Sequence, residues 1–209
     1  MQKDLKYFTA YSSVSHCGFV LFGVAALNFM GIKGAVIQMF SHGIMTGLFF
    51  GLIGMVYGRT HTRMIPEMGG LAKVMPWLAV SFYVAGLASL GLPGFAGFVA
   101  ESHVFLGGFF GNDWHSLTLM RVLTILATLS IVVTAVYVLR GLATVFQGPI
   151  TDPHFEKLGD ATLTEKISTG MLVATLTITG VAPFLLINLI ESSIMPIVNR
   201  LHGTGLGPL

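Results

Sequence analysis

Residues 75–110 read MPWLAVSFYVAGLASLGLPGFAGFVAESHVFLGGFF. This run is almost entirely apolar and far exceeds the ~20 residues that a transmembrane helix needs. Its middle holds Gly91-Leu92-Pro93-Gly94, where proline removes a backbone donor and clashes with the preceding turn. The stretch predicts one long transmembrane helix that is broken at Leu92-Pro93-Gly94. Such breaks often lie where a transporter passes an ion, but a simple proline kink is the alternative.

Four further apolar stretches flank this one, at about 7–30, 34–57, 116–146 and 167–190. Tight turns are expected at Gly31-Ile32-Lys33 and Gly111-Asn112-Asp113, and a longer polar segment, with an interfacial amphipathic helix as one option, at 148–166. The pattern predicts an all-α polytopic membrane helix bundle of about five transmembrane helices, forming a single transmembrane domain over residues 1–209.

Composition supports a membrane protein and excludes other classes. Charged residues are only 10% and hydrophobic residues 54% of the chain, whereas soluble domains carry about 25% charged residues. The net charge of +2 and the absence of a basic run argue against a nucleic-acid partner. The lone Cys17 excludes an intrachain disulfide and a cysteine-based metal site, so we expect no metal and no cofactor.

Charge also predicts how the chain crosses the bilayer. With five spans, most lysines and arginines fall on the side that carries the N-terminus, which the positive-inside rule assigns to the cytoplasm. The C-terminus is then expected outside. The basic residues on the N-terminal side are Lys3, Lys6, Arg59, Arg63, Lys73, Arg140, Lys157 and Lys166; those on the other side are Lys33, Arg121 and Arg200.

Glu101 is the strongest candidate for chemistry. It follows Pro93 in the second half of the broken span, and ionisable residues inside a membrane are costly and usually functional. A carboxylate in hydrocarbon becomes neutral or finds a partner, which suits a proton carrier. The alternative is a structural carboxylate that bonds a neighbouring helix.

His42 is a second candidate, and it belongs to a polar stripe. Gln38, His42 and Thr46 recur at i, i+4 and i+8, so they form one polar stripe on a helix. The stripe predicts either the lining of a hydrated path or an interhelical hydrogen-bond seam.

His16 lies in the first span, in a hydroxyl-rich stretch that includes Ser12 and Ser15. Imidazole can donate and accept protons near physiological pH, although a lone buried histidine is more often structural. As a pair, His16 and His42 could also ligate a heme, but the hydroxyl- and amide-rich surroundings favour proton transfer.

Several motifs together carry a family resemblance. They cover roughly Asp4 to Glu101, and the rest of the chain agrees in hydropathy only. The chain resembles the antiporter-like subunits of respiratory complex I, in particular subunit M, or chain 4, of NADH:quinone oxidoreductase. The matching segments are Asp4-Leu5-Lys6, Ala10-Tyr11-Ser12-Ser13-Val14-Ser15-His16, Gly34-Ala35-Val36-Ile37-Gln38-Met39-Phe40-Ser41-His42-Gly43, Arg59-Thr60-His61-Thr62-Arg63, Met68-Gly69-Gly70-Leu71, Ala88-Ser89-Leu90-Gly91-Leu92-Pro93-Gly94 and Gly97-Phe98-Val99-Ala100-Glu101.

The resemblance implies a role for each matching position. His16 and His42 would belong to a central hydrated axis, and Glu101 would be the terminal proton-exchanging residue. Leu92-Pro93-Gly94 would be the family's discontinuous helix. The family usually has Gly-Glu where this chain has Ala100-Glu101.

The resemblance also implies the larger subunit and the membrane complex to which the chain would belong. Subunits of this family have ~14 spans in two inverted repeats plus extra helices, so this chain would be the C-terminal part, without the in-span lysines of the full subunit. It would move protons in a non-redox part of a bacterial cytoplasmic-membrane oxidoreductase, have no catalytic activity alone, and contact other membrane-arm subunits. The alternatives are a subunit of a multisubunit cation/proton antiporter and a piece with only an assembly role.

Overall fold

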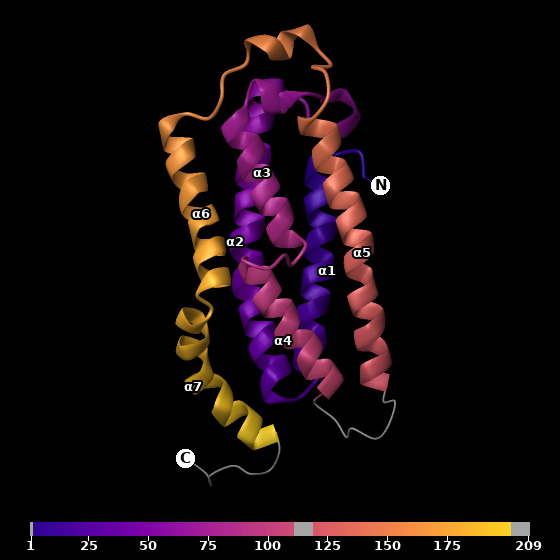
Figure 1. Cartoon of the computed structure of the whole chain (residues 1–209), viewed down its shortest axis with the longest axis vertical. Helices are drawn as coiled ribbons and strands as arrows, with labels where there is room; N and C mark the ends of the chain where they lie inside the picture. Colours follow the sequence, from indigo (N-terminus) through magenta and orange to yellow (C-terminus); the bar gives the residue numbers. More distant parts are fainter. Residues whose placement is uncertain (1, 111–118, 202–209) are drawn as a thin grey trace.

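The computed structural model describes residues 2–110 and 119–201, and every regular element in these ranges is helical. Figure 1 shows them as one elongated bundle. The α-helices are α1 (Leu5–Ala25), α2 (Phe29–Thr60), α3 (Pro76–Ser89), α4 (Ala96–Phe110), α5 (Leu119–Phe146), α6 (Leu163–Val181) and α7 (Phe184–Leu201); the short 3₁₀ helices are η1 (Ile65–Glu67), η2 (Leu71–Lys73) and η3 (Pro153–Lys157).

The helices form five passes along the long axis of the bundle. The α3 and α4 helices lie one after the other as a single interrupted pass, and so do α6 and α7, so α1 begins and α7 ends at opposite ends of the bundle (Figure 1). Within the described residues, α1, α2, α5 and α7 are each long and apolar enough to span a membrane. The prediction of an all-α polytopic membrane bundle is confirmed.

The turn between the first two passes was predicted at the wrong residues. The α2 helix begins at Phe29, so Gly31-Ile32-Lys33 is helical. The side chain of Asn28 causes this early start, because its oxygen accepts from the Gly31 N–H at 2.9 Å and caps the helix. Its amide donates to the Gly107 carbonyl at 2.9 Å, which ties the turn to the end of α4. Lys33 therefore lies inside a spanning helix, where no lysine was expected.

The last pass differs from the predicted continuous span at 167–190. It breaks at Ala182-Pro183 and then continues as α7 to Leu201. Pro183 cannot donate a helical hydrogen bond, and the chain restarts one residue later. The polar segment at 148–166 contains the 3₁₀ helix η3 and no α-helix before Leu163. The predicted turn at 111–113 lies outside the described residues.

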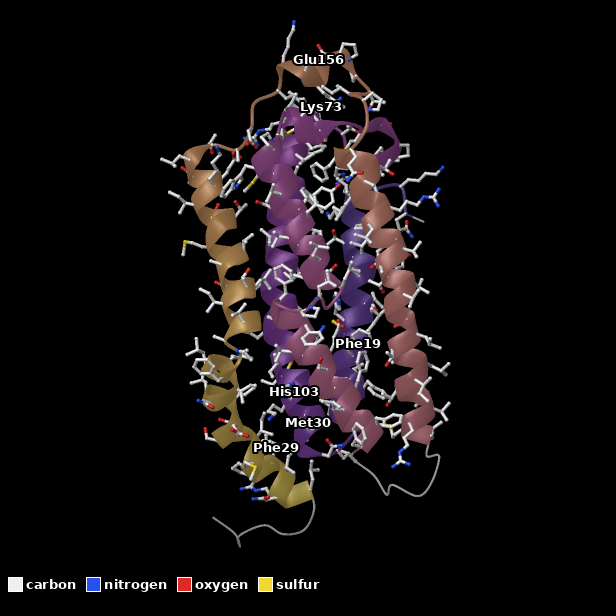
Figure 2. All side chains as sticks on the ribbon, viewed as in Figure 1. Phe19, Phe29, Met30, Lys73, His103 and Glu156 are labelled. Atoms are coloured by element: carbon white, nitrogen blue, oxygen red, sulfur yellow. The ribbon has the colours of Figure 1, made fainter. Side chains whose placement is uncertain are left out.

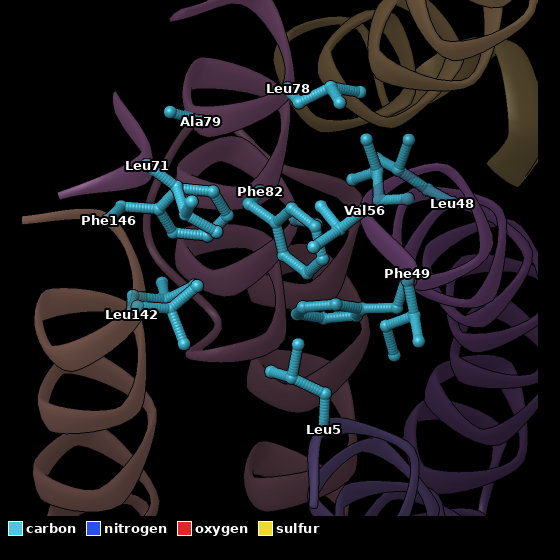
Figure 3. Close-up of a cluster of buried hydrophobic side chains, with 14 of the residues drawn as sticks. Leu5, Leu48, Phe49, Val56, Leu71, Leu78, Ala79, Phe82, Leu142 and Phe146 are labelled. Carbon is cyan, nitrogen blue, oxygen red and sulfur yellow. The ribbon is translucent and has the colours of Figure 1, made fainter. Parts of the chain in front are cut away.

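An aromatic and aliphatic core fills the half of the bundle that holds η1, η2 and α3. Phe82 and Phe146 are fully buried, with ring centroids 5.0 Å apart, and Phe49 packs on Phe82 from the other side at 6.1 Å. Figure 3 shows these rings between Leu142, Leu71 and Val56. In a membrane, close van der Waals packing rather than removal from water holds helices together, and the tight contacts of these rings fix α3 against α2 and α5.

Polar contacts close the same end of the bundle. Arg59 at the end of α2 binds the Glu165 carboxylate through two nitrogens, at 2.6 and 3.1 Å. Asp160 accepts from the Trp77 N–H at 3.0 Å and so caps α3. Figure 2 shows Lys73 and Glu156 at this end, opposite Phe29 and Met30. The α6 helix is thereby fixed beside α2 and α3.

Candidate functional site

The predicted residues meet where α3 and α4 are interrupted. Glu101 on α4 and His16 on α1 are 5% and 3% exposed, and Glu101 Oε1 lies 3.9 Å from His16 Nε2. The two side chains come from helices that are far apart in sequence, and their approach depends on α4 lying against α1. This distance is longer than a hydrogen bond, so the buried acid and the buried imidazole can exchange a proton through one bridging water.

The helix break supplies a hydrogen-bond acceptor for His16. The ring Nε2 lies 3.2 Å from the Ser89 carbonyl, and because a carbonyl can only accept, Nε2 is the donor. Ser89 is the last residue of α3, and the chain turns out of the helix at Gly91, whose φ is 62°. Pro93, four residues after Ser89, has no N–H with which a continued helix could occupy that carbonyl. The sequence of the break therefore leaves the acceptor that orients His16.

The other nitrogen of the same ring is an acceptor without a partner. With the proton on Nε2, the neutral ring carries a lone pair on Nδ1, and this buried atom has no hydrogen-bond partner among the described residues. Buried polar atoms are nearly always hydrogen-bonded to protein or to ordered water. His16 is therefore ready to receive a proton at Nδ1 and to donate one at Nε2.

His42 on α2 lies next to His16. Its ring centroid lies 5.2 Å from that of His16, and the Thr46 hydroxyl lies 3.3 Å from a ring nitrogen of His42. Gln38, one turn in the other direction, is 2% exposed and its Oε1 has no partner. The predicted stripe is thus present on α2, with Gln38 buried and His42 and Thr46 half-buried.

A small cavity adjoins the acid and the imidazole, with room for about one water molecule. The predicted Ser15 lines this cavity, while Ser12 is buried one turn before His16. The lining residues are Ser15, His16, Phe19, Ser89, Leu90, Glu101, Ile131 and Thr134.

The interruption itself has the predicted position. The α3 helix ends at Ser89 and α4 begins at Ala96, with Leu92-Pro93-Gly94 between them. Gly91 and Gly94 have φ angles of 62° and 101°, a region that L-residues with a Cβ rarely adopt. The prediction of a broken helix is confirmed, and the simple-kink alternative is wrong.

Some residues of the site were not singled out from the sequence. Ser89 and Gly91 were quoted only as part of a motif, although the four-residue spacing from Ser89 to Pro93 could have indicated the free carbonyl. Thr134 carried no signal, because its approach to Glu101 depends on how α5 packs. His103 is on a different face of α4, where its Nδ1 donates to the Val99 carbonyl at 2.7 Å.

Lys33 forms a separate ionic contact near the other end of the bundle. It is 9% exposed, lies 3.9 Å from Glu191 on α7, and its ammonium lies 4.7 Å from the centre of the Phe29 ring. No group of three or more His, Cys, Asp or Glu side chains that could hold a metal ion occurs in the described part of the chain.

Comparison with known proteins shows what this arrangement is similar to. Residues 1–140 match the family described as NADH:quinone oxidoreductase/Mrp antiporter, transmembrane. The chain is 38% identical to NAD(P)H-quinone oxidoreductase chain 4 of Thermosynechococcus vestitus, over 95% of this chain and 38% of that protein. It is also 38% identical to NADH-quinone oxidoreductase subunit M of Rhodobacter capsulatus, over 96% of this chain and 38% of that protein. The chain thus spans less than two fifths of these relatives.

Two solved structures contain chains whose fold is similar to that of this chain. A chain of respiratory complex I from Thermus thermophilus superposes with a TM-score of 0.81 at 28% identity, over 99% of this chain and 41% of that one. A chain of the Mrp complex from Dietzia sp. superposes with a TM-score of 0.83 over 95% of this chain and 44% of that one. The latter is only 19% identical, so it shows a shared fold alone.

Proposed function

This chain belongs to the NADH:quinone oxidoreductase/Mrp antiporter transmembrane family, and on that premise we propose that it moves protons in the membrane arm of a complex I-type quinone oxidoreductase. The observation that carries the proposal is the buried contact of Glu101 with His16 beside a helix break. Electron transfer from NADH to quinone would take place in other subunits. Because the chain spans 38% of its relatives, it would act as the C-terminal part of a ~14-span unit.

Proton transfer follows from the two nitrogens of His16. A proton arrives at Nδ1 from the side of His42, and the Nε2 proton passes to the Glu101 carboxylate through the water that the cavity can hold. The neutral ring then carries its proton on Nδ1, and the Nε2 lone pair faces the Ser89 carbonyl, where two acceptors repel each other. The starting tautomer returns when Nδ1 releases its proton and Nε2 takes one up, and the Ser89 carbonyl favours this exchange because it accepts from an Nε2–H.

The proposal includes the orientation of the chain in the membrane. The basic residues gather mostly at the end of the bundle that holds the start of α1, η1, η2 and η3. The positive-inside rule supports a cytoplasmic location for this end, and the membrane would be the cytoplasmic membrane of a bacterium. Labelling tests it: Glu156→Cys in a Cys17→Ser chain should react with a membrane-impermeant maleimide only from the cytoplasmic side. Reaction from outside would reverse the orientation. The expected partners are other membrane-arm subunits and lipid.

The decisive experiment is proton pumping by the assembled complex in inverted membrane vesicles. Glu101→Gln keeps the size of the side chain but cannot release a proton, so the rate of proton pumping should fall by about 100-fold, the lower range of acid–base contributions to a rate. Glu156→Gln, at an exposed site in η3, is the control and should pump normally. Normal pumping by a normally assembled Glu101→Gln complex would rule the proposal out.

A cation/proton antiporter subunit is the second candidate, favoured by the shared family and by the fold of the Mrp complex chain. Sodium prefers oxygen ligands, as hard cations do, whereas Glu101 faces an imidazole nitrogen. The site therefore suits a proton better. Sodium-dependent antiport in vesicles without quinone reduction would decide for the antiporter. If Glu101 and His42 can be neutralised together with loss of complex abundance only, the role is assembly.

A further inference from the structure

The carboxyl group of Glu101 packs against Gly91, in the break between α3 and α4. A Cβ built on Gly91 would overlap Glu101 Oε2 and would lie 3.0 Å from Cδ and 3.5 Å from Oε1. All three carboxyl atoms therefore lie over the bare Cα of Gly91. No other residue type leaves this space empty.

The same contact sets the direction of the carboxyl group. With Gly91 on one side, Oε1 points to His16 Nε2, 3.9 Å away. Leu90, the residue before Gly91, lines the cavity that adjoins Glu101. A methyl group at position 91 would displace the carboxyl group of Glu101 from its position over Gly91 and change its distance to His16.

We propose that Gly91 is a positioning residue for Glu101, and that its missing side chain is what allows the carboxyl group to sit against the helix break and face His16. This inference rests on the proposed role of Glu101 in proton transfer. It assigns Gly91 a function beyond the breaking of the helix.

The chain contains a matched control for backbone strain. Gly94 in the same break has a φ of 101°, further from the left-handed minimum than the 62° of Gly91. A Cβ on Gly94 would meet nothing within 4 Å. Backbone strain alone therefore predicts that Gly94→Ala is at least as harmful as Gly91→Ala, whereas contact with Glu101 predicts the reverse order.

The first measurement is made on the assembled complex. Gly91→Ala should shift the infrared carboxyl band of Glu101, assigned by its loss in Glu101→Gln, and should lower proton pumping about tenfold or more, since a misplacement of ~1 Å can cost ~100-fold. Gly94→Ala should leave the band in place. An unshifted band in Gly91→Ala, or equal shifts in both variants, would overturn the inference.

A second measurement stays informative if Gly91→Ala assembles poorly. In the isolated chain, Gly91→Ala should lower Tm because its methyl group meets the carboxyl group. In a Glu101→Ala chain the same substitution should cost less than half as much, because the clash is gone. Equal losses of Tm in the two backgrounds would contradict the inference.

The two proposals fail in different ways. If Glu101→Gln pumps normally, the proposed function is wrong, yet the band shift and the coupled Tm losses still establish that Gly91 positions Glu101. If Glu101→Gln abolishes pumping while Gly91→Ala behaves like Gly94→Ala, the proposed function holds and the role of Gly91 is wrong.

Discussion

The carbonyl oxygen of Ser89 accepts a hydrogen bond from Nε2 of His16 at 3.2 Å. This carbonyl belongs to the last residue of α3, which ends because Gly91 adopts a φ of 62° and the N–H groups of Gly91 and Leu92 bond back to the preceding turn. Pro93, four residues after Ser89, has no N–H for a helical bond and keeps the helix from continuing through this turn. The glycine turn and the proline together leave the acceptor that fixes the orientation of a buried imidazole.

This relationship predicts the effect of Pro93→Ala. Alanine allows helical backbone at the break, so α3 can extend through it. In the extended helix the new N–H occupies the Ser89 carbonyl, and His16 loses a hydrogen bond worth about 1 kcal/mol. We expect proton pumping to fall roughly fivefold and the ¹⁵N signals of His16 to change from one tautomer to a mixture. The control is Pro196→Ala, which removes a proline inside α7 and should leave both readouts unchanged. An unchanged His16 spectrum in Pro93→Ala would show that the proline does not control the ring.

The α2–α4 contact predicts unequal effects of two glycine substitutions in α2. A Cβ on Gly34 would lie 2.5 Å from the Val104 nitrogen and 2.9 Å from the His103 carbonyl carbon, and backbone atoms cannot move aside easily. Gly34→Ala should therefore lower the free energy of unfolding by about 1–3 kcal/mol, as overpacking does. Thermal or denaturant unfolding in detergent measures this change.

Gly43, on the same helix, provides the comparison. A Cβ there would meet nothing within 4 Å, and alanine is favoured over glycine in a helix interior by roughly 0.5–1 kcal/mol. Gly43→Ala should thus be neutral or stabilising in the isolated chain. If both variants lose equal stability, close backbone packing between α2 and α4 is not what Gly34 provides.

Local signals in the sequence were enough for the broken pass. An apolar run of excess length and a proline between two glycines predict the interruption at Leu92-Pro93-Gly94 without knowledge of the tertiary structure. The same signal was present at Pro183 and was missed, because the apolar stretch around it has the length of an ordinary span. The early start of α2 was missed because Asn28, which caps it, lay inside a predicted span.

Contacts between passes could not be predicted in this way. The sequence singled out Glu101, His16 and His42 as ionisable residues in apolar spans, but their meeting depends on how α1, α2 and α4 pack. The burial of Lys33 had no local signal either, since its partner Glu191 lies on α7. Helix periodicity places a residue on one face of its own helix, but it does not say which helix covers that face.

The ion pair of Arg59 and Glu165 predicts a dependence of stability on acid. Glu165 lies in the first turn of α6, at the polar end of the bundle, and its hydrogen bonds with Arg59 lower the pKa of the carboxyl from the ordinary 4.5 to about 2. A pKa that is lower in the folded state gives stability that is present above pH 4.5 and lost as pH falls toward 2.

The measurement compares the native chain with Glu165→Gln. Thermal unfolding at pH 6 and pH 3 should show a larger loss of Tm for the native chain, because the glutamine variant has no such proton to gain. Glu156→Gln, at an exposed site without this arginine, should lose as much as the native chain. Parallel losses in the native and Glu165→Gln chains would mean that the ion pair adds no acid-sensitive stability.

The contact of Lys33 with Glu191 predicts that the two partners are not equivalent. Lys33 is buried in α2, whereas the Glu191 side chain is 43% exposed. Glu191→Gln leaves an ammonium group in apolar surroundings without its counter-charge, and breaking a buried pair in this way costs up to about 3–5 kcal/mol. Lys33→Met removes the buried charge and leaves a carboxylate that is only half-buried, so it should cost less.

Limited proteolysis and thermal unfolding test this asymmetry. Beside this pair, α7 packs on α2 through a small apolar cluster of Ile32, Ile194 and Val198. Cleavage within α7 should therefore speed up more in Glu191→Gln than in Lys33→Met. The double variant should return close to Lys33→Met, because it no longer has an unpaired buried charge. Equal cleavage of both single variants would show that the ion pair does not hold α7 in place.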